Sequence, residues 1–222
     1  MLRTVLRASV LLAACVSLSL PAAARLGERK NNESKEVQEA LKDGVAAMEA
    51  GNYQAAVDAF SKAIEIGGLG EQNEKAAHLN RGIAYAGLNQ CPNAIPDFDK
   101  ALEIGGDDAL AYIQRAQCHS TTGNGAAGTA DAKKATAMMP DDASYAKLYC
   151  AIAFNAKVYA DAGPACETVV VRFEPQNAQL TQASAQSYEA AGNKAKANEM
   201  WTKLLALDPS SEAAKQGIKR TA

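Results

Sequence analysis

The sequence predicts an all-α protein, a solenoid of about five helix-turn-helix repeats closed by a C-terminal capping helix. A pattern of small and large apolar residues returns about every 34 residues, glycine or proline ends every copy, and no part of the pattern requires a strand. The chain has 222 residues, of which 48% are hydrophobic and 5% aromatic. This composition can bury a core, so a disordered or collagen-like chain is excluded.

The repeating pattern is a small residue, a second small residue 12 positions later, then a large residue and another small one at steps of 4 and 3. It is clearest from Gly44 and Gly82, returns more faintly from Ala116, Cys150 and Ala185, and advances by 38, 34, 34 and 35 residues. Facing small residues let two helix backbones approach to the close end of the roughly 8 to 10 Å packing range. The large residues expected to fill the seams are Phe60, Phe98 and Trp201.

With this period and spacing, the repeat resembles the tetratricopeptide repeat family over residues 37–211. The expected copies are 37–70, 75–108, 109–142, 143–177 and 178–211, and the capping helix and tail are expected at 212–222. About four extra residues between the first two copies predict a longer surface loop. The resemblance implies a right-handed α-solenoid whose first helices line a concave groove, and a scaffold or adaptor that binds other proteins.

Residues 1–24 have the features of a secretory signal peptide, with Arg3 and Arg7 before an apolar run and small residues before Arg25. The run is too short for the roughly 20 residues of a membrane span. We therefore expect an exported protein, periplasmic or secreted, with a flexible lead-in at 25–36 and no transmembrane anchor after cleavage. In the alternative, the resemblance of residues 12–15 to a lipobox makes the protein a lipoprotein anchored at Cys15.

Four cysteines follow the predicted signal peptide, an even number in a chain bound for an oxidising compartment. The repeat register places Cys150 and Cys166 at facing positions on the two helices of one copy, which predicts a disulfide between them. Cys91 begins a second helix and Cys118 lies near the end of the next first helix, so antiparallel stacking predicts the other pair. The alternative is that all four are buried free thiols.

No catalytic constellation is present in the sequence, and we predict that the protein is not an enzyme and needs no cofactor. His119 follows Cys118 directly, and adjacent helical residues point about 100° apart, so they cannot act as base and nucleophile. His78 lies at a packing position, and the acidic pairs at 107–108 and 141–142 are expected to cap helices. A zinc site is not expected, since no close Cys-x-x-Cys pair occurs. A net charge of -2 gives no basic field for nucleic acid.

The predicted partner-binding groove changes chemistry along the array. Its N-terminal half is apolar and its remainder is polar and nearly uncharged. The apolar residues are Leu41, Val45, Met48, Leu79, Ile83, Leu110 and Ile113. The polar residues are Gln117, Ser120, Thr121, Lys147, Asn155, Gln179, Gln182 and Gln186.

The groove chemistry predicts a protein-interaction scaffold of the cell envelope that binds an apolar peptide segment or an amphipathic helix. In one alternative, these apolar residues pack on one another or on the lead-in segment. In another, the same face makes a homodimer, and the protein is a self-assembling structural protein.

Overall fold

The computed structural model describes residues 22–222 of the chain, with side chains from residue 34 onward. Most of the expected signal peptide, including Cys15, therefore lies outside the described residues. Within the described part the chain forms eleven helices and no strand, which confirms the predicted all-α solenoid. The helices are α1 (Ala22–Glu49), α2 (Tyr53–Ile66), α3 (Glu71–Gly87), α4 (Cys91–Gly105), α5 (Ala109–Thr121), α6 (Gly125–Met138), α7 (Ala143–Asn155), α8 (Tyr159–Arg172), α9 (Ala178–Ala190), α10 (Lys194–Leu207) and α11 (Glu212–Thr221).

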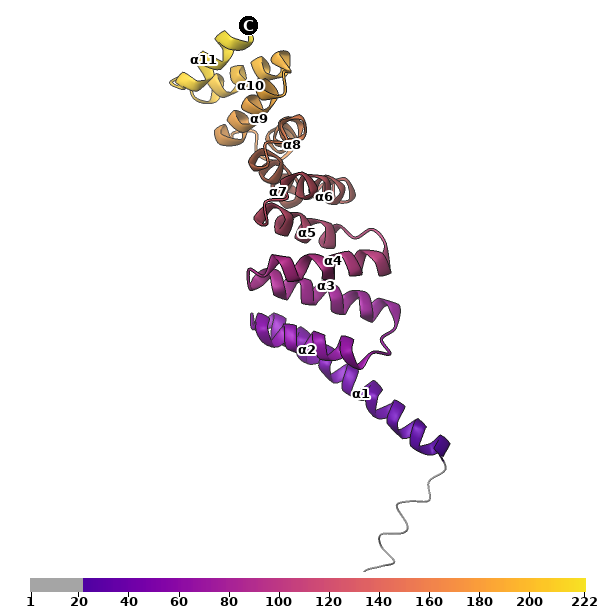
Figure 1. The fold of residues 1–222 in the computed structure, drawn as a ribbon. Helices are drawn as coiled ribbons and strands as arrows, with labels where there is room; N and C mark the ends of the chain where they lie inside the picture. The colour runs from indigo at the N-terminus through magenta and orange to yellow at the C-terminus, as the bar shows by residue number, and fades with distance from the viewer. Residues whose placement is uncertain (1–21) are drawn as a thin grey trace, which may run out of the picture.

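The helices stack in chain order as five antiparallel pairs, and α11 covers the last pair (Figure 1). Each helix packs mainly on the helix before and the helix after it. The core is therefore a series of small clusters along the stack, as expected for a repeat array in which each unit contacts its neighbours. Among residues 22–222, no helix combines the length and the apolar character needed to cross a membrane.

Small residues at the first position of the repeat set the distance between paired helices. A Cβ atom on Gly44 would lie 2.7 Å from the ring of Phe60, and one on Gly82 would lie 2.7 Å from the ring of Phe98. Both rings are fully buried. Glycine is thus required at these two positions because the aromatic ring occupies the space that any side chain would need.

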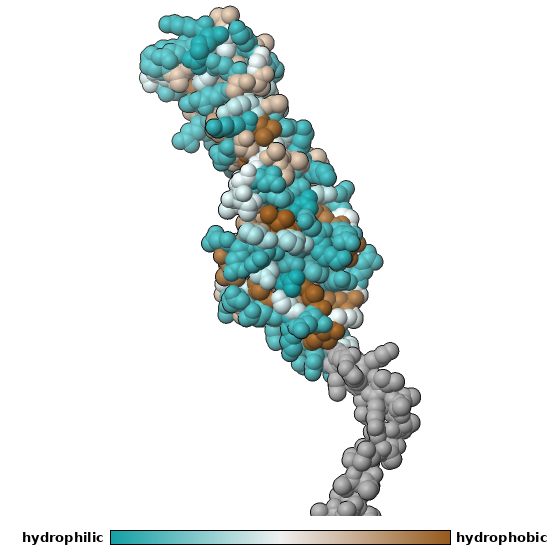
Figure 2. Space-filling view, in the orientation of Figure 1, coloured by the Kyte–Doolittle hydropathy of each residue, from teal (hydrophilic) through white to brown (hydrophobic). Residues whose placement is uncertain are grey.

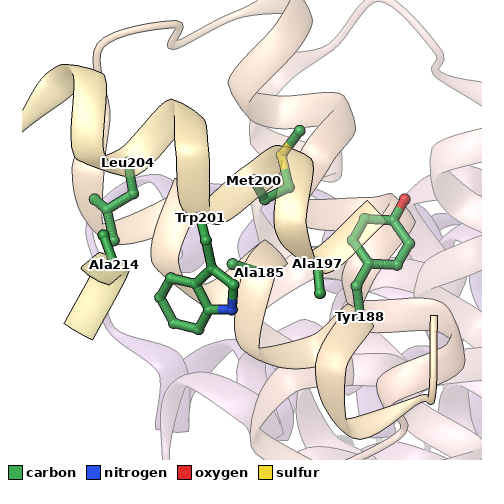
Figure 3. Packing of buried hydrophobic residues seen from close by; sticks show 7 residues of the cluster. All are labelled: Ala185, Tyr188, Ala197, Met200, Trp201, Leu204 and Ala214. Atoms are coloured by element: carbon green, nitrogen blue, oxygen red, sulfur yellow. The ribbon is translucent and has the colours of Figure 1, made fainter. Parts of the chain in front are cut away.

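The last cluster shows how the array ends. Trp201 of α10 packs beside Met200, Leu204 and Ala185, and Ala214 of α11 closes the cluster (Figure 3). The indole Nε1 donates a hydrogen bond to Glu189 at 3.0 Å, so the ring is buried without losing its polar contact. The helix α11 therefore covers apolar surface that a further repeat would otherwise cover.

Helix starts follow the local sequence. Asp108 accepts a hydrogen bond from the Ala111 amide at 3.0 Å, and Asp142 accepts one from the Ser144 amide at 2.8 Å. The expectation that these acidic pairs cap helices is confirmed for these two members.

The structure differs from the expected lead-in at 25–36, because α1 begins at Ala22 and runs through this segment without a break. The physical reason is local composition. The segment is rich in Glu, Lys and Arg, which favour helix, and no proline follows until Pro92. The polar character that indicated a flexible segment is equally compatible with a solvated helix.

Candidate binding groove

The first helices of the repeats, α1, α3, α5, α7 and α9, line the concave side of the stack. The helix α1 touches α3, α3 touches α5, and α5 touches α7, although each of these pairs is separated in the chain by a second helix. The second helices make their substantial contacts with helices adjacent in the chain. The shorter side of a curved stack is the one where alternate helices meet, so the predicted groove face is the inner face.

The predicted apolar groove residues differ in how much surface they offer. Val45 on α1 is 45% exposed and Leu110 on α5 is 41% exposed. Between them along the stack lie Leu79 and Ile83 of α3, which are half-buried against the cluster around Phe98. Leu41 and Met48 are half-buried against the cluster around Phe60. Figure 2 shows that hydrophobic side chains gather on the visible face toward the N-terminal repeats and become sparse toward the C-terminus.

Ile113 was expected in the groove, but the structure places it in the core, with only 3% of its surface exposed. It packs with Tyr112, Ile152 and Ala132. The reason lies in the third repeat, where Ala132 stands at the position that Phe60 and Phe98 occupy in the first two. Ile113 fills space that the missing aromatic ring leaves open.

The polar half of the groove is open and electrically neutral. Gln117 and Gln182 are half-buried, while Gln179 and Gln186 are exposed, and within the described residues none of these four amides has a hydrogen-bond partner. Ser120 and Asn155 line an opening of about 380 Å³ between the ends of α5 and α7.

The charged residue expected in this half of the groove, Lys147, pairs with Glu174. The Lys147 ammonium and the Asn177 amide both hold the pKa of Glu174 below its usual value. The positive charge is therefore neutralised within the array.

A cavity of about 350 Å³ lies at the N-terminal end of the groove, between α1, the end of α2 and the start of α3. The chain closes it with the segment 67–70. The expected longer loop is not formed, because the extra residues extend α3, which begins at Glu71 and has 17 residues against 13 in α5, α7 and α9. The predicted groove residue Leu41 lines one wall, together with Gln38.

A buried ion pair joins the two helices of the second repeat, and its arginine also reaches the first repeat. Arg81 donates two hydrogen bonds to Asp97 of its own repeat, from Nε and Nη2, both at 2.7 Å, and a third from Nη1 to Ser61 of the preceding repeat at 3.1 Å. His78 Nδ1 lies 2.8 Å from the same Asp97 carboxylate. Hydrogen bonding to Asp97 raises the pKa of Arg81. His78 is thus a half-buried structural residue, as its packing position predicts.

The third repeat uses the same device. Arg115 donates to Asp131 from Nε at 2.7 Å and from Nη2 at 2.8 Å, and reaches Asp99 of the preceding repeat at 2.5 Å. Its hydrogen bond with Asp131 is the main cause that raises its pKa. These pairs were not predicted from the sequence. The signal was present, since both pairs are an arginine followed 16 residues later by an aspartate, and they recur 34 residues apart.

The four cysteines form two pairs in the structure. Cys91 at the start of α4 is bonded to Cys118 of α5, with Cα atoms 5.0 Å apart, and Cys150 of α7 is bonded to Cys166 of α8, with Cα atoms 4.7 Å apart. These are the pairs that the repeat register predicts. The first joins two neighbouring repeats and the second joins the two helices of one repeat, so both lie within the array.

The described side chains offer no obvious reactive centre. Cys118 is tied into a disulfide, so its neighbour His119 has no thiol to activate. Among the described residues, no group of three or more His, Cys, Asp or Glu side chains is placed to hold a metal ion.

Comparison with known proteins identifies the class. Residues 183–211 match the tetratricopeptide repeat. The chain is 32% identical over 108 residues to a DnaJ homolog subfamily C member 7 homolog of Dictyostelium discoideum, and this match covers 49% of the chain and about a fifth (20%) of the relative. The resemblance to the tetratricopeptide repeat family is confirmed, since the matched residues form part of the last repeat of the array.

Solved structures of the same architecture cover most of the chain. YrrB has a TM-score of 0.65 at 17% identity and covers 86% of this chain and 97% of its own. MamA has a TM-score of 0.63 at 17% identity, covering 79% of this chain and 93% of its own. A MamA from Desulfovibrio magneticus has a TM-score of 0.60 at 17% identity, covering 80% and 97%. At these identities the similarity describes the fold.

Proposed function

We propose that the protein is a non-catalytic scaffold of the cell envelope that binds an apolar peptide segment or helix of a partner protein in its concave groove. The observation that carries the proposal is the run of apolar side chains along the inner face, with Val45 and Leu110 exposed and Leu79 and Ile83 half-exposed between them. Exposed apolar surface on a concave face is the usual mark of a protein-binding site.

The structural similarity to YrrB supports a peptide partner, because YrrB is described as a tetratricopeptide-repeat protein with an unusual peptide-binding site. The neutral polar half of the groove supports a partner segment without strong net charge. Export is supported by the features of residues 1–24 and by the four cysteines that follow. Mass spectrometry of the processed N-terminus tests export directly, since a chain beginning at Arg25 supports it and an acylated Cys15 makes the protein a lipoprotein.

Photo-crosslinking from position 110 in cells tests the groove, because Leu110 is exposed and a probe there does not disturb the core. A probe at Lys62, on the second helix α2, is the control. A discrete partner attached only from position 110 is the expected result. Cross-links to a second copy of the chain alone would favour the self-assembling structural protein.

Substitution tests the same site by loss of binding. Val45→Asp together with Leu110→Asp should abolish capture of that partner at unchanged helicity, because a charge in each apolar contact must be desolvated on binding. Val171→Asp is the matched control, since Val171 is 60% exposed but lies on the second helix α8. If the unchanged protein, the double variant and Val171→Asp capture the partner equally, the groove is not the binding site.

A further inference from the structure

The loop between the first two repeats shapes the cavity at the end of the groove. Gly67 and Gly68 have φ angles of 76° and 71°, a left-handed conformation that other residues adopt at a cost. They lead the chain into the segment that closes the cavity. The cavity of about 350 Å³ is near the lower limit of small-ligand pockets, roughly 300 to 1,000 Å³, so it suits one or two side chains of a partner.

Four residues that line the cavity are apolar, and the other lining residues carry no charge. Val37, Leu41, Ile66 and Leu69 come from α1, α2 and the loop. Val37 is buried, and the other three are half-buried. An apolar group of a partner can cover the surface that they leave open, and removing this surface from water stabilises the complex.

On the α3 side the cavity is lined by Asn73, and two acidic residues flank Asn73 in the sequence. Glu71 and Glu74 lie in the first turn of α3, directly after the loop, and neither has an ion-pair partner among the described residues. The nearby Lys75 is already paired with Asp108 at 2.9 Å. Glu74 also lines a smaller opening of about 110 Å³ under the same loop.

Two lysines of α1, Lys35 and Lys42, line a separate depression together with Gln38 and Glu39. Among the described side chains, Glu71 and Glu74 therefore have no compensating cation.

We propose that this cavity is an anchor subsite, which takes one large apolar side chain of the partner while a basic residue next to that side chain meets Glu71 and Glu74. This inference rests on the proposed function, because it names the partner chemistry at one end of the same groove. The apolar wall provides the affinity for the anchor. The two carboxylates provide the preference for a neighbouring positive charge.

A panel of short synthetic peptides tests the subsite. Each has a serine and glycine background with phenylalanine or serine at one position, followed by lysine, serine or glutamate. Binding is followed by amide NMR shifts of Gly67, Gly68 and Gly70 at peptide concentrations up to about 1 mM, which detects complexes as weak as about -4 kcal/mol. The phenylalanine–lysine peptide is expected to bind at least tenfold more tightly than the serine–lysine peptide. No shift at these three glycines with any peptide would overturn the proposal.

Variants separate the two parts of the subsite. The double variant Glu71→Gln, Glu74→Gln should remove the preference for lysine over glutamate and keep the preference for phenylalanine over serine. Leu69→Asp should lose binding of the whole panel, and Val171→Asp should bind like the unchanged protein. Unaltered selectivity in the first two variants would overturn the proposal. If capture from position 110 persists while these variants bind their partner normally, the subsite is wrong and the scaffold function stands.

Discussion

Arg81 and Asp97 face each other from the two helices of the second repeat and share two hydrogen bonds of 2.7 Å. The Asp97 side chain is only 5% exposed. Such a buried pair provides little net stability compared with apolar residues of the same size, but its loss on one side leaves a charge without a partner. Because Arg81 also reaches Ser61, the pair fixes the orientation of the second repeat on the first.

Asp97→Ala is expected to destabilise the protein by about 3 kcal/mol, because Arg81 keeps a buried charge that nothing compensates. The double variant Arg81→Met, Asp97→Leu should lose much less, since both charges are removed together. Urea unfolding followed by helical circular dichroism measures both. The control is Glu103→Ala, which breaks the exposed pair with Lys100 and should cost about 0.5 kcal/mol or less. Equal losses in the single and double variants would contradict the assigned role.

The apolar part of the fold could be predicted from the sequence because the residues that pack together recur at a regular spacing along the chain. Gly82 packs against the ring of Phe98, and Gly44 packs in the same way against Phe60 at the same sequence spacing in the preceding repeat. Polar contacts give a weaker signal in the sequence. Arg81 and Asp97 are exposed types in most helices, so only their recurrence 34 residues later, as Arg115 and Asp131, could have indicated a buried pair.

The groove could be predicted only in part, because register gives a residue's position on its helix but not the volume of its neighbours. Ile113 has the register of a groove residue and is nevertheless buried, since Ala132 leaves space beside it. The anchor cavity was beyond prediction for a similar reason. The extra residues predicted a longer loop, but they extend α3 instead, and the path of the short connection at 67–70 depends on the left-handed conformations of Gly67 and Gly68.

Gly82→Ala should destabilise the protein by about 1 to 3 kcal/mol, although alanine favours helix more than glycine does. The added methyl group would lie 2.7 Å from the Phe98 ring, which is fully buried and cannot move away. Adding Phe98→Leu should recover part of the loss. Thermal unfolding measures the series.

Gly105→Ala is the control for that series, because the new methyl group would meet only the flexible chain of Lys75. It should be neutral or slightly stabilising. The steric explanation fails if Gly82→Ala and Gly105→Ala have the same midpoint of unfolding.

The two cysteine pairs should be oxidised in the exported protein. Alkylation after denaturation without reductant is expected to label none of Cys91, Cys118, Cys150 and Cys166, and alkylation after reduction should label all four. The closed loops have sequence separations of 27 and 16 residues, for which the chain-entropy model gives about 3 kcal/mol each. Reduction should therefore lower the midpoint of thermal unfolding. Labelling of all four without reductant would show that they are free thiols.

Glu167 should make a part of the stability depend on pH. Its burial favours the neutral acid, but hydrogen bonds from Lys196 and Tyr188 outweigh burial and hold its pKa below the usual value of 4.5. A carboxylate with a lowered pKa in the folded state stabilises that state above the unfolded pKa, and this contribution is lost as the pH falls through the folded pKa.

Glu167→Gln should therefore be less stable than the unchanged protein near pH 7. The difference in their free energies of unfolding should disappear as the pH is lowered from about 5 to about 3. Lys196→Met should show a gap with the same direction of pH dependence, because it removes the donor that stabilises the ionised form. Urea unfolding at several pH values measures the two differences, in which the titrations common to all three proteins cancel. A gap that stays constant from pH 7 to pH 3 would mean that Glu167 acts through its packing and not through its charge.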